Sequence, residues 1–378
     1  MLKRRKDTML EAIIYQLKGL FFIAAGIFGL GLLIGIHEFG HYLFARLFGV
    51  RAPSFSIGIG PTLLSKKLWG TDFKISAIPL GGYVEIAGLA EIGQGDQAEA
   101  LATDSGSFNM KPYWQRTIIL LGGIIFNFIL AFLIFVVLAF TGMPKSLLLN
   151  PEASKPIINT IIKNGVADKS GLIIGDEILQ INTIKTPHVL AAITEFQKNA
   201  NQDITITIKR NNEKINLLVM LDKTGRLGVS YKTEYAPRAS LINGFKEAWR
   251  ATWEITTKTI QGFIHLFKKR STEGLGGPLT LISELIKNAE QGLSLFLFFL
   301  AFISINLAII NLIPIPITDG GQFVFTTIEA VIRRPISEKL RLIVHNISWV
   351  LVLALLGFLT IKDSKVLFWD KIKHLFGK

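Results

Sequence analysis

Long apolar runs dominate the pattern of hydrophobic and polar positions along the chain. A helix needs about 20 apolar residues to cross the hydrocarbon core of a bilayer, and four runs reach that length, at about 19–48, 117–140, 292–317 and 342–361. The second run, TIILLGGIIFNFILAFLIFVVLAF, has no charged residue. The first run exceeds the roughly 7–15-residue core of a signal peptide, and no small-residue cleavage site follows it. The pattern predicts a polytopic α-helical membrane protein with four transmembrane helices.

Shorter periodicities separate these runs. Residues 51–115 contain β-type segments broken by glycine and proline, such as SFSIGIG, which predict a membrane-associated β-hairpin region and a loop. Residues 150–235 alternate apolar and polar positions, as in DITITIKR, and include the amphipathic stretch VLAAITEFQKNA. Alternation is typical of strands with one buried face. We therefore expect one α+β domain inserted between the second and third transmembrane helices.

The whole chain then divides into eight expected segments. The segment 240–290 is expected to contain a helix at the membrane interface, because it carries Trp249, Trp253 and several basic residues. The segments are a basic N-terminal tail with the first transmembrane helix (1–50), the hairpin and loop region (51–115), the second transmembrane helix (116–141), the α+β domain (150–235), the interfacial helical segment (240–290), the third transmembrane helix (291–322), the fourth (341–362) and a basic C-terminal tail (363–378).

Charge and composition narrow the possible partners. The net charge is +13, but the basic residues are spread through tails and loops, and Lys and Arg beside membrane helices usually contact anionic lipid headgroups. We expect the lipid bilayer as a partner, and no nucleic acid. The chain has no cysteine, which excludes disulfides and thiolate metal sites.

The first apolar run ends in HEFGH, residues 37–41. His37 and His41 are four residues apart, so a helix places both on one face, where they can share one Zn²⁺ ion. Glu38 can then act as general base on a zinc-bound water. The alternative is a chance match, but the chain has only six histidines, and buried ionisable groups in a membrane are costly unless they are paired or bind metal.

A zinc site of this kind needs a third protein ligand. The third run ends in NLIPIPITDGGQ, where Pro314 and Pro316 break the helix and deliver Asp319 on unwound backbone. Asp319 could instead cap the next helix, but together with HEFGH the ligand interpretation is favoured. Asn127 and Asn311 lie within apolar runs, where an interhelical hydrogen bond and a contact to substrate are equally good interpretations.

These motifs resemble the site-2 protease family of intramembrane zinc metalloproteases, and the chain looks most like its bacterial regulator-of-sigma-E protease branch. HEFGH and NLIPIPITDGG match the zinc motifs of the family, GIIFNFILA its second-helix motif, and GGPL a further segment. SGLIIGDEILQIN resembles the peptide-binding loop of a PDZ domain. The resemblance implies one Zn²⁺ per chain, Asp319 as the third ligand, and a PDZ loop of Gly171, Leu172, Gly175 and Asp176.

Three features depart from the family pattern. Ile124 stands where the second-helix motif has proline, and Thr318 where a leucine usually precedes the aspartate. A single PDZ-like module fits between the second and third helices, where well-known enterobacterial members carry two. Models of substrate gating that need two modules therefore do not transfer to this chain.

The resemblance further implies a multi-pass protease of the bacterial inner membrane, with its PDZ-like domain in the periplasm and its zinc site toward the cytoplasm. Counts of Lys and Arg in the loops do not decide the orientation. The implied substrates are single-pass membrane proteins, either anti-sigma factors already trimmed by an upstream site-1-type protease or remnant signal peptides.

A transmembrane substrate must unwind before water reaches its amide bonds, and an exposed β-edge near the zinc would pair with the extended segment. The stretch from Gly58 to Gly60 is the candidate edge, with an ordinary interfacial hairpin as the alternative. Two other functions compete with proteolysis. One is a membrane-anchored PDZ scaffold that has lost catalysis, and the other is a transporter that uses the broken helix as an ion site.

Overall fold

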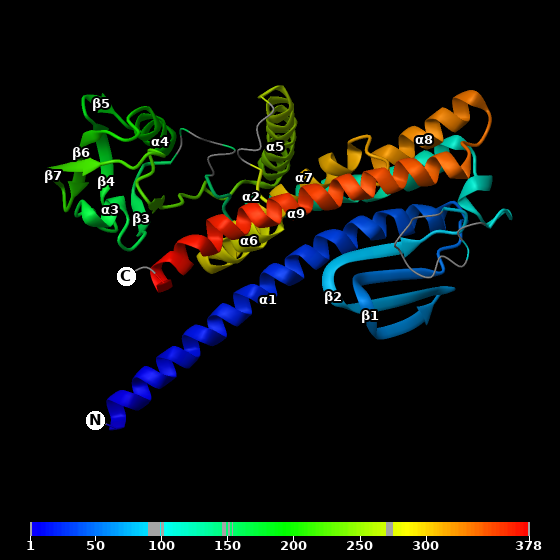
Figure 1. Cartoon of the computed structure of the whole chain (residues 1–378), viewed down its shortest axis with the longest axis horizontal. Helices are drawn as coiled ribbons and strands as arrows, with labels where there is room; N and C mark the ends of the chain where they lie inside the picture. Colours follow the sequence, from blue (N-terminus) through cyan, green and yellow to red (C-terminus); the bar gives the residue numbers. More distant parts are fainter. Residues whose placement is uncertain are drawn as a thin grey trace. The chain divides into compact units, whose positions relative to one another are not determined.

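The computed structural model describes residues 2–89, 99, 102–145, 149, 152, 154–269 and 275–376 (Figure 1). Residues 90–98, 100 and 101 of the loop expected after the β-hairpin lie outside these residues. The chain forms two compact units, one made of residues 1–136 and 256–378 and the other of residues 137–255. Each unit is described by itself.

Within the described residues, four helices carry stretches long and apolar enough to cross a membrane, which confirms the expected membrane protein. They are α1 (Leu2–Leu47), α2 (Tyr113–Thr141), α7 (Leu293–Leu312) and α9 (Glu338–Phe376). Helix α9 continues through most of the expected C-terminal tail, because no glycine or proline interrupts residues 362–376. Helix α7 ends at Leu312, before Pro314 and Pro316, so the last residues of the third apolar run are not helical.

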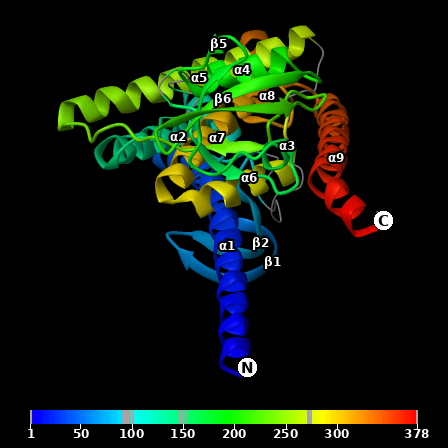
Figure 2. The same cartoon turned by 90° about the vertical axis from the view of Figure 1, so that its left-hand side faces the viewer.

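A β-hairpin packs beside α1 in the first unit (Figures 1 and 2). Strands β1 (Ser54–Leu68) and β2 (Thr71–Glu85) are joined by Trp69 and Gly70, both at positive φ, as a tight hairpin turn requires. The first part of β1, Ser54–Ile57, pairs on one side with Asp72–Ile75 and on the other with Gly82–Glu85. The end of β2 is thereby folded back toward α1.

The expected interfacial segment forms two helices, α5 (Leu241–Lys269) and α6 (Pro278–Gln291). Proline at the first position of α6 fixes its start. Leu33 of α1, Leu285 of α6, and Leu300 and Ile303 of α7 form a shared core. Helix α8 (Asp319–Ile332) follows the break after α7, and the short 3₁₀ helix η1 (Phe108–Met110) precedes α2.

The second unit contains an α+β domain. A four-stranded antiparallel sheet has the order β5-β4-β6-β7, and a separate pair joins β3 to β8. Side chains from β4, β6 and β7 form its core with Ala192 and Phe196 of α4. The elements are β3 (Ile158–Ile161), α3 (Val166–Lys169), β4 (Glu177–Ile181), β5 (Ile184–Lys185), α4 (Val189–Lys198), β6 (Asp203–Arg210), β7 (Glu213–Met220) and β8 (Val229–Tyr231).

Candidate metal centre

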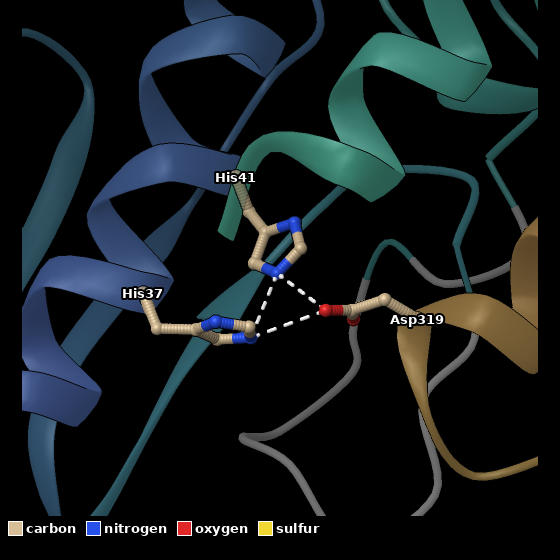
Figure 3. A group of neighbouring side chains, drawn as sticks. All are labelled: His37, His41 and Asp319. Atoms are coloured by element: carbon tan, nitrogen blue, oxygen red, sulfur yellow. Dashed lines mark hydrogen bonds and ion pairs between the residues drawn. The ribbon is translucent and has the colours of Figure 1, made fainter. Parts of the chain in front are cut away.

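Helix α1 presents two buried histidines to the start of α8. His37 and His41 lie on one face of α1, and only 6% and 7% of their surfaces are exposed. Their Nε2 atoms are 3.2 Å apart, and they lie 3.2 Å and 3.5 Å from Oδ2 of Asp319 (Figure 3). The structure thus brings together three ligand atoms from segments more than 270 residues apart in sequence.

The hydrogen bonds around these residues leave three atoms as acceptors: Nε2 of His37, Nε2 of His41 and Oδ2 of Asp319. Nδ1 of His41 lies 2.8 Å from the Ile119 carbonyl oxygen, so Nδ1 carries the proton and Nε2 of a neutral ring has a free lone pair. Oδ2 of Asp319 is buried and has no hydrogen-bond partner among the described residues. Lone pairs that face one another repel, and a shared cation removes that repulsion. Two neutral imidazoles and one carboxylate form a donor set typical of catalytic zinc, so the residues fit Zn²⁺.

Asn127 supports the second ring from α2. Its amide lies 3.0 Å from Nδ1 of His37, and its Oδ1 atom is buried with no hydrogen-bond partner in the part of the chain that the structure describes. Amide nitrogen and oxygen are exchanged by a 180° turn of the group. With Oδ1 toward the ring, it accepts the proton of Nδ1 and leaves Nε2 of His37 free for metal. Outer partners of this kind orient metal-binding histidines.

Three glycines let α1 and α2 approach closely at the metal centre. A Cβ on Gly123 would collide with Nε2 of His41 and lie 2.6 Å from Cε1 of His37. Gly40 and Gly122 meet backbone to backbone, with no room for a side chain on either. Small residues are what allow membrane helices to pack this tightly. No pattern in the sequence marks these glycines as contacts, although Gly40 lies inside HEFGH and the other two form a pair in the second apolar run.

Asp319 is the first residue of α8, and Thr318 caps that helix. The Thr318 hydroxyl accepts from the Gly321 amide and lies 2.6 Å from the Ile313 carbonyl oxygen, to which it donates. The alternative in which Asp319 itself is the cap is therefore wrong. Side chains on Gly320 or Gly321 would collide with the carbonyls of the preceding loop. The Asp-Gly-Gly sequence thus permits a sharp return of the backbone that aims the carboxylate at α1.

Glu38 lines a cavity of about 220 Å³ together with His37, His41 and Asp319. Such a cavity holds several water molecules. The Glu38 carboxylate accepts a hydrogen bond from the backbone of Val84, which is near the end of β2. Glu38 is not part of the three-atom cluster, and this is the placement expected of a base rather than a ligand.

The other expected membrane-site residues divide into two sets. Asn311 lines the cavity, with its amide 3.3 Å from Nε2 of His37, while Pro314 and Pro316 lie in the loop that leads to Asp319. Gly58 and Gly60 adopt positive φ at an irregular part of the hairpin and do not line the cavity. The β-segment that does is the end of β2, through Val84. Sequence reasoning missed it because GGYVE has no feature that marks proximity to the metal.

The expected PDZ loop residues lie in the second unit, where they stabilise a turn. Gly171 and Gly175 adopt positive φ, and Leu172 is buried in the domain core. The Asp176 carboxylate, which is 1% exposed, accepts from Nε and Nη2 of Arg210 at 2.8 Å each and from the Ile173 amide at 2.9 Å. The binding of a peptide at this loop stays a prediction.

Comparisons with known proteins agree with this geometry. The profile of peptidase family M50 matches residues 25–355. A protein of Campylobacter jejuni with the name "Putative zinc metalloprotease" is 31% identical over 88% of this chain and 90% of its own length. Proteins with the same descriptive name from Clostridium perfringens (31% identical, 88% of this chain, 95% of its own) and Rickettsia conorii (29% identical, 90% and 97%) are also similar. The chain belongs to peptidase family M50, and it is a zinc-dependent protease with several membrane-spanning helices.

Proposed function

We propose that this protein is an endopeptidase that cleaves transmembrane segments of single-pass membrane proteins, with His37, His41 and Asp319 as zinc ligands and Glu38 as general base. The observation that carries the proposal is the convergence of two imidazole nitrogens and one carboxylate oxygen on the wall of a cavity that Glu38 also lines. When bound, zinc would polarise the scissile carbonyl and make a water molecule easier for Glu38 to deprotonate.

Each side chain around the cavity has its own role in the reaction. A Glu38 carboxylate oxygen takes the proton of the attacking water and passes it to the leaving amide nitrogen. The hydrogen bond from Val84 holds that carboxylate in place. Asn127 and the Ile119 carbonyl hold the rings of His37 and His41 with Nε2 inward. Asn311, whose amide also lies in the cavity, is placed to contact the substrate backbone.

The end of β2 is the proposed docking edge for the unwound substrate. Among the described strands, Gly82–Glu85 pairs only with Ser54–Ile57 of β1, and Val84 lines the cavity. A Cβ on Gly82 would lie 3.3 Å from Cγ of Glu38, so this backbone passes directly beside the base. An extended substrate that adds to this edge would present its amide bonds to Glu38.

The proposal also covers the biological process, the substrates and the orientation in the membrane. We infer regulated intramembrane proteolysis in the bacterial inner membrane, with anti-sigma factors or remnant signal peptides as substrates and an upstream site-1-type protease. The metal motif ends the first membrane crossing and residues 150–235 follow the second, so the two face opposite compartments. We place the PDZ-like domain in the periplasm, where it selects substrates, and the zinc toward the cytoplasm.

A comparison of Glu38→Gln with Glu290→Gln tests the proposal. Both proteins are purified in lipid nanodiscs and assayed for zinc content and for cleavage of a model transmembrane segment. Glu38→Gln should keep about one zinc per chain and lose about 10²–10⁴-fold in cleavage rate, because only the base is removed. Glu290→Gln changes an exposed residue of α6 and should behave as wild type. Normal cleavage by a folded Glu38→Gln protein would overturn the mechanism, and a wild-type protein that binds zinc but cleaves nothing would favour the inactive scaffold.

A further inference from the structure

The loop between α7 and α8 lies at the end of a membrane-spanning helix, where unpaired backbone groups are costly. Pro314 and Pro316 prevent this loop from forming helical hydrogen bonds. The hydroxyl of Thr318 lies 2.6 Å and 2.9 Å from two carbonyl oxygens of the loop. The Pro316 carbonyl depends on side chains from elsewhere, and the first of these is Gln322, whose Nε2 donates at 3.0 Å.

The second partner of the Pro316 carbonyl is His345 of α9. Nε1 of Trp349, one turn further along α9, donates to Nε2 of His345 at 3.0 Å. An indole nitrogen can only donate, so Nε2 of His345 carries the lone pair and Nδ1 carries the proton. Nδ1 is then the atom that donates to Pro316. Trp349 therefore fixes the tautomer in which His345 can hold the loop.

The position of His345 on α9 is unusual for a membrane helix. Most large apolar side chains of the span Lys339–Lys365 are exposed, whereas the polar residues His345, Ser348 and Asp363 are buried. The burial of Asp363, near the end of this span, is explained by its hydrogen bonds. Its carboxylate accepts from backbone amides at the start of α6. His345 and Trp349 line the metal cavity instead. An ionisable residue turned inward from a membrane span indicates a role at the site.

We propose that His345, oriented by Trp349, is a positioning residue for the metal ligand Asp319. Pro316 is three residues before Asp319, and its carbonyl is held from α8 by Gln322 and from α9 by His345. Fixing this carbonyl fixes the direction in which the chain enters α8, and hence the place of the Asp319 carboxylate relative to the two ligand histidines. The inference rests on the proposed function for its effect on cleavage, but its effect on metal binding is independent of it.

Three variants of the full-length protein in nanodiscs test this role. His345→Phe fills the same space without a donor, His345→Asn keeps an N–H group near the place of Nδ1, and Ser348→Ala is the matched control. Ser348 is buried on the same helix, but its hydroxyl donates within α9 to the Val344 carbonyl. The measurements are the rate of zinc release to a chelator, the absorption spectrum of the Co²⁺-substituted protein, and kcat and KM for a model transmembrane segment.

His345→Phe should release zinc about 10–100-fold faster and lose a similar factor in kcat with little change in KM, the usual size of an outer-partner effect. The Co²⁺ spectrum should change with it. His345→Asn should recover most of both losses, and Ser348→Ala should match wild type. If His345→Phe does not fold, Trp349→Phe, which removes only the donor to the ring, should give a smaller acceleration of zinc release.

Two results would overturn the assignment. In the first, His345→Phe keeps wild-type zinc release while KM rises, which would make His345 a substrate contact. In the second, His345→Asn is as defective as His345→Phe, which would mean that the hydrogen bond to Pro316 is not what matters. A wild-type protein that holds zinc without cleaving would refute the proposed function and would still leave the comparison of zinc release valid.

Discussion

Two aspartates, Asp176 and Asp319, one in each unit, have opposite kinds of surroundings. Asp176 of the α+β domain receives two nitrogen donors from Arg210 and a backbone amide, so its charge is fully compensated within the fold. Asp319 faces two imidazole nitrogens whose protons are directed elsewhere, and its Oδ2 atom lacks a hydrogen-bond partner. A buried charge is stable only when it is paired or bound to metal. The complete set of donors indicates a structural role, and the incomplete set indicates a site.

The largest expected effect is that of Asp319→Ala. Removal of this ligand should lower zinc content and reduce cleavage by about 10³-fold or more, as expected for a residue at the reacting centre. Amide hydrogen exchange in β4 and β6 of the α+β domain should stay unchanged, since Asp319 has no part in that core. Zinc by elemental analysis and cleavage of a model segment check the prediction. Full zinc occupancy with full activity would mean that α1 and α8 do not share a metal.

Gly123→Ala should have the next largest effect. The added methyl group collides with the ring of His41 and presses on that of His37, and small displacements of catalytic groups cost up to about 10²-fold in rate. We expect faster zinc release and a 10–100-fold lower kcat by the same reasoning. Gly357→Ala is the control, because nothing lies within 4 Å of the added atom in α9. Equal behaviour of the two variants would show that the α1–α2 crossing does not constrain the rings.

Asp176→Ala should have the opposite effects to those expected for Asp319→Ala. The change leaves the Arg210 guanidinium and the Ile173 amide without their shared acceptor. Amide exchange in β4 and β6 should accelerate, and the midpoint of thermal unfolding of the domain should fall by roughly 5–10 °C. Zinc content and cleavage of a short model segment should stay within about twofold, a margin that covers ordinary surface effects. Zinc loss in Asp176→Ala would contradict the division of roles between the two aspartates.

The smallest expected effect concerns a solvent-exposed aspartate. Its charge is paired with an arginine at the protein surface and not in the interior. Hydrogen bonds from Arg51 lower the pKa of Asp104 to about 2, below its ordinary 3.8. A carboxyl whose pKa is lowered by folding stabilises the fold above its unfolded pKa and loses that contribution as pH falls. Amide protection in residues 102–108 should therefore weaken between about pH 4 and pH 2, and Asp104→Asn should remove this pH dependence. Exposed pairs contribute little, so zinc binding should not change.

Local pattern was enough to predict some parts of the molecule. Strand β6 alternates buried Ile204, Ile206 and Ile208 with more exposed neighbours, as the period of DITITIKR indicates. The four membrane helices follow from run length, and the pairing of His37 with His41 from helical spacing. Asp319 could be found because proline and glycine around an acidic residue are rare in an apolar run. In each case the signal lies within one continuous stretch of sequence.

Other parts of the site depend on approach between distant segments. Gly123 is needed because two rings from α1 occupy the space where its side chain would be, and nothing within α2 indicates this. Val84 reaches Glu38 because β1 pairs with β2 on both sides, a register that the hairpin sequence does not specify. His345 is 29 residues after Pro316 and on another helix. Single-sequence patterns carry no information on such distances.

The glycine contact between α1 and α2 places the pivot of any tilt of α2 beside the metal centre. Thr141 at the end of α2 is 18 residues beyond Gly123, or about 27 Å along a helix that rises about 1.5 Å per residue. A tilt of α2 by about 10° around this crossing moves that end by about 5 Å, while the backbone beside His37 and His41 hardly shifts. The packing of α2 opposes such a tilt, because Phe135 and Leu138 are fully buried and the Phe135 ring lies against Phe298 of α7. The crossing therefore keeps a fixed angle, and the three candidate ligand atoms keep their spacing.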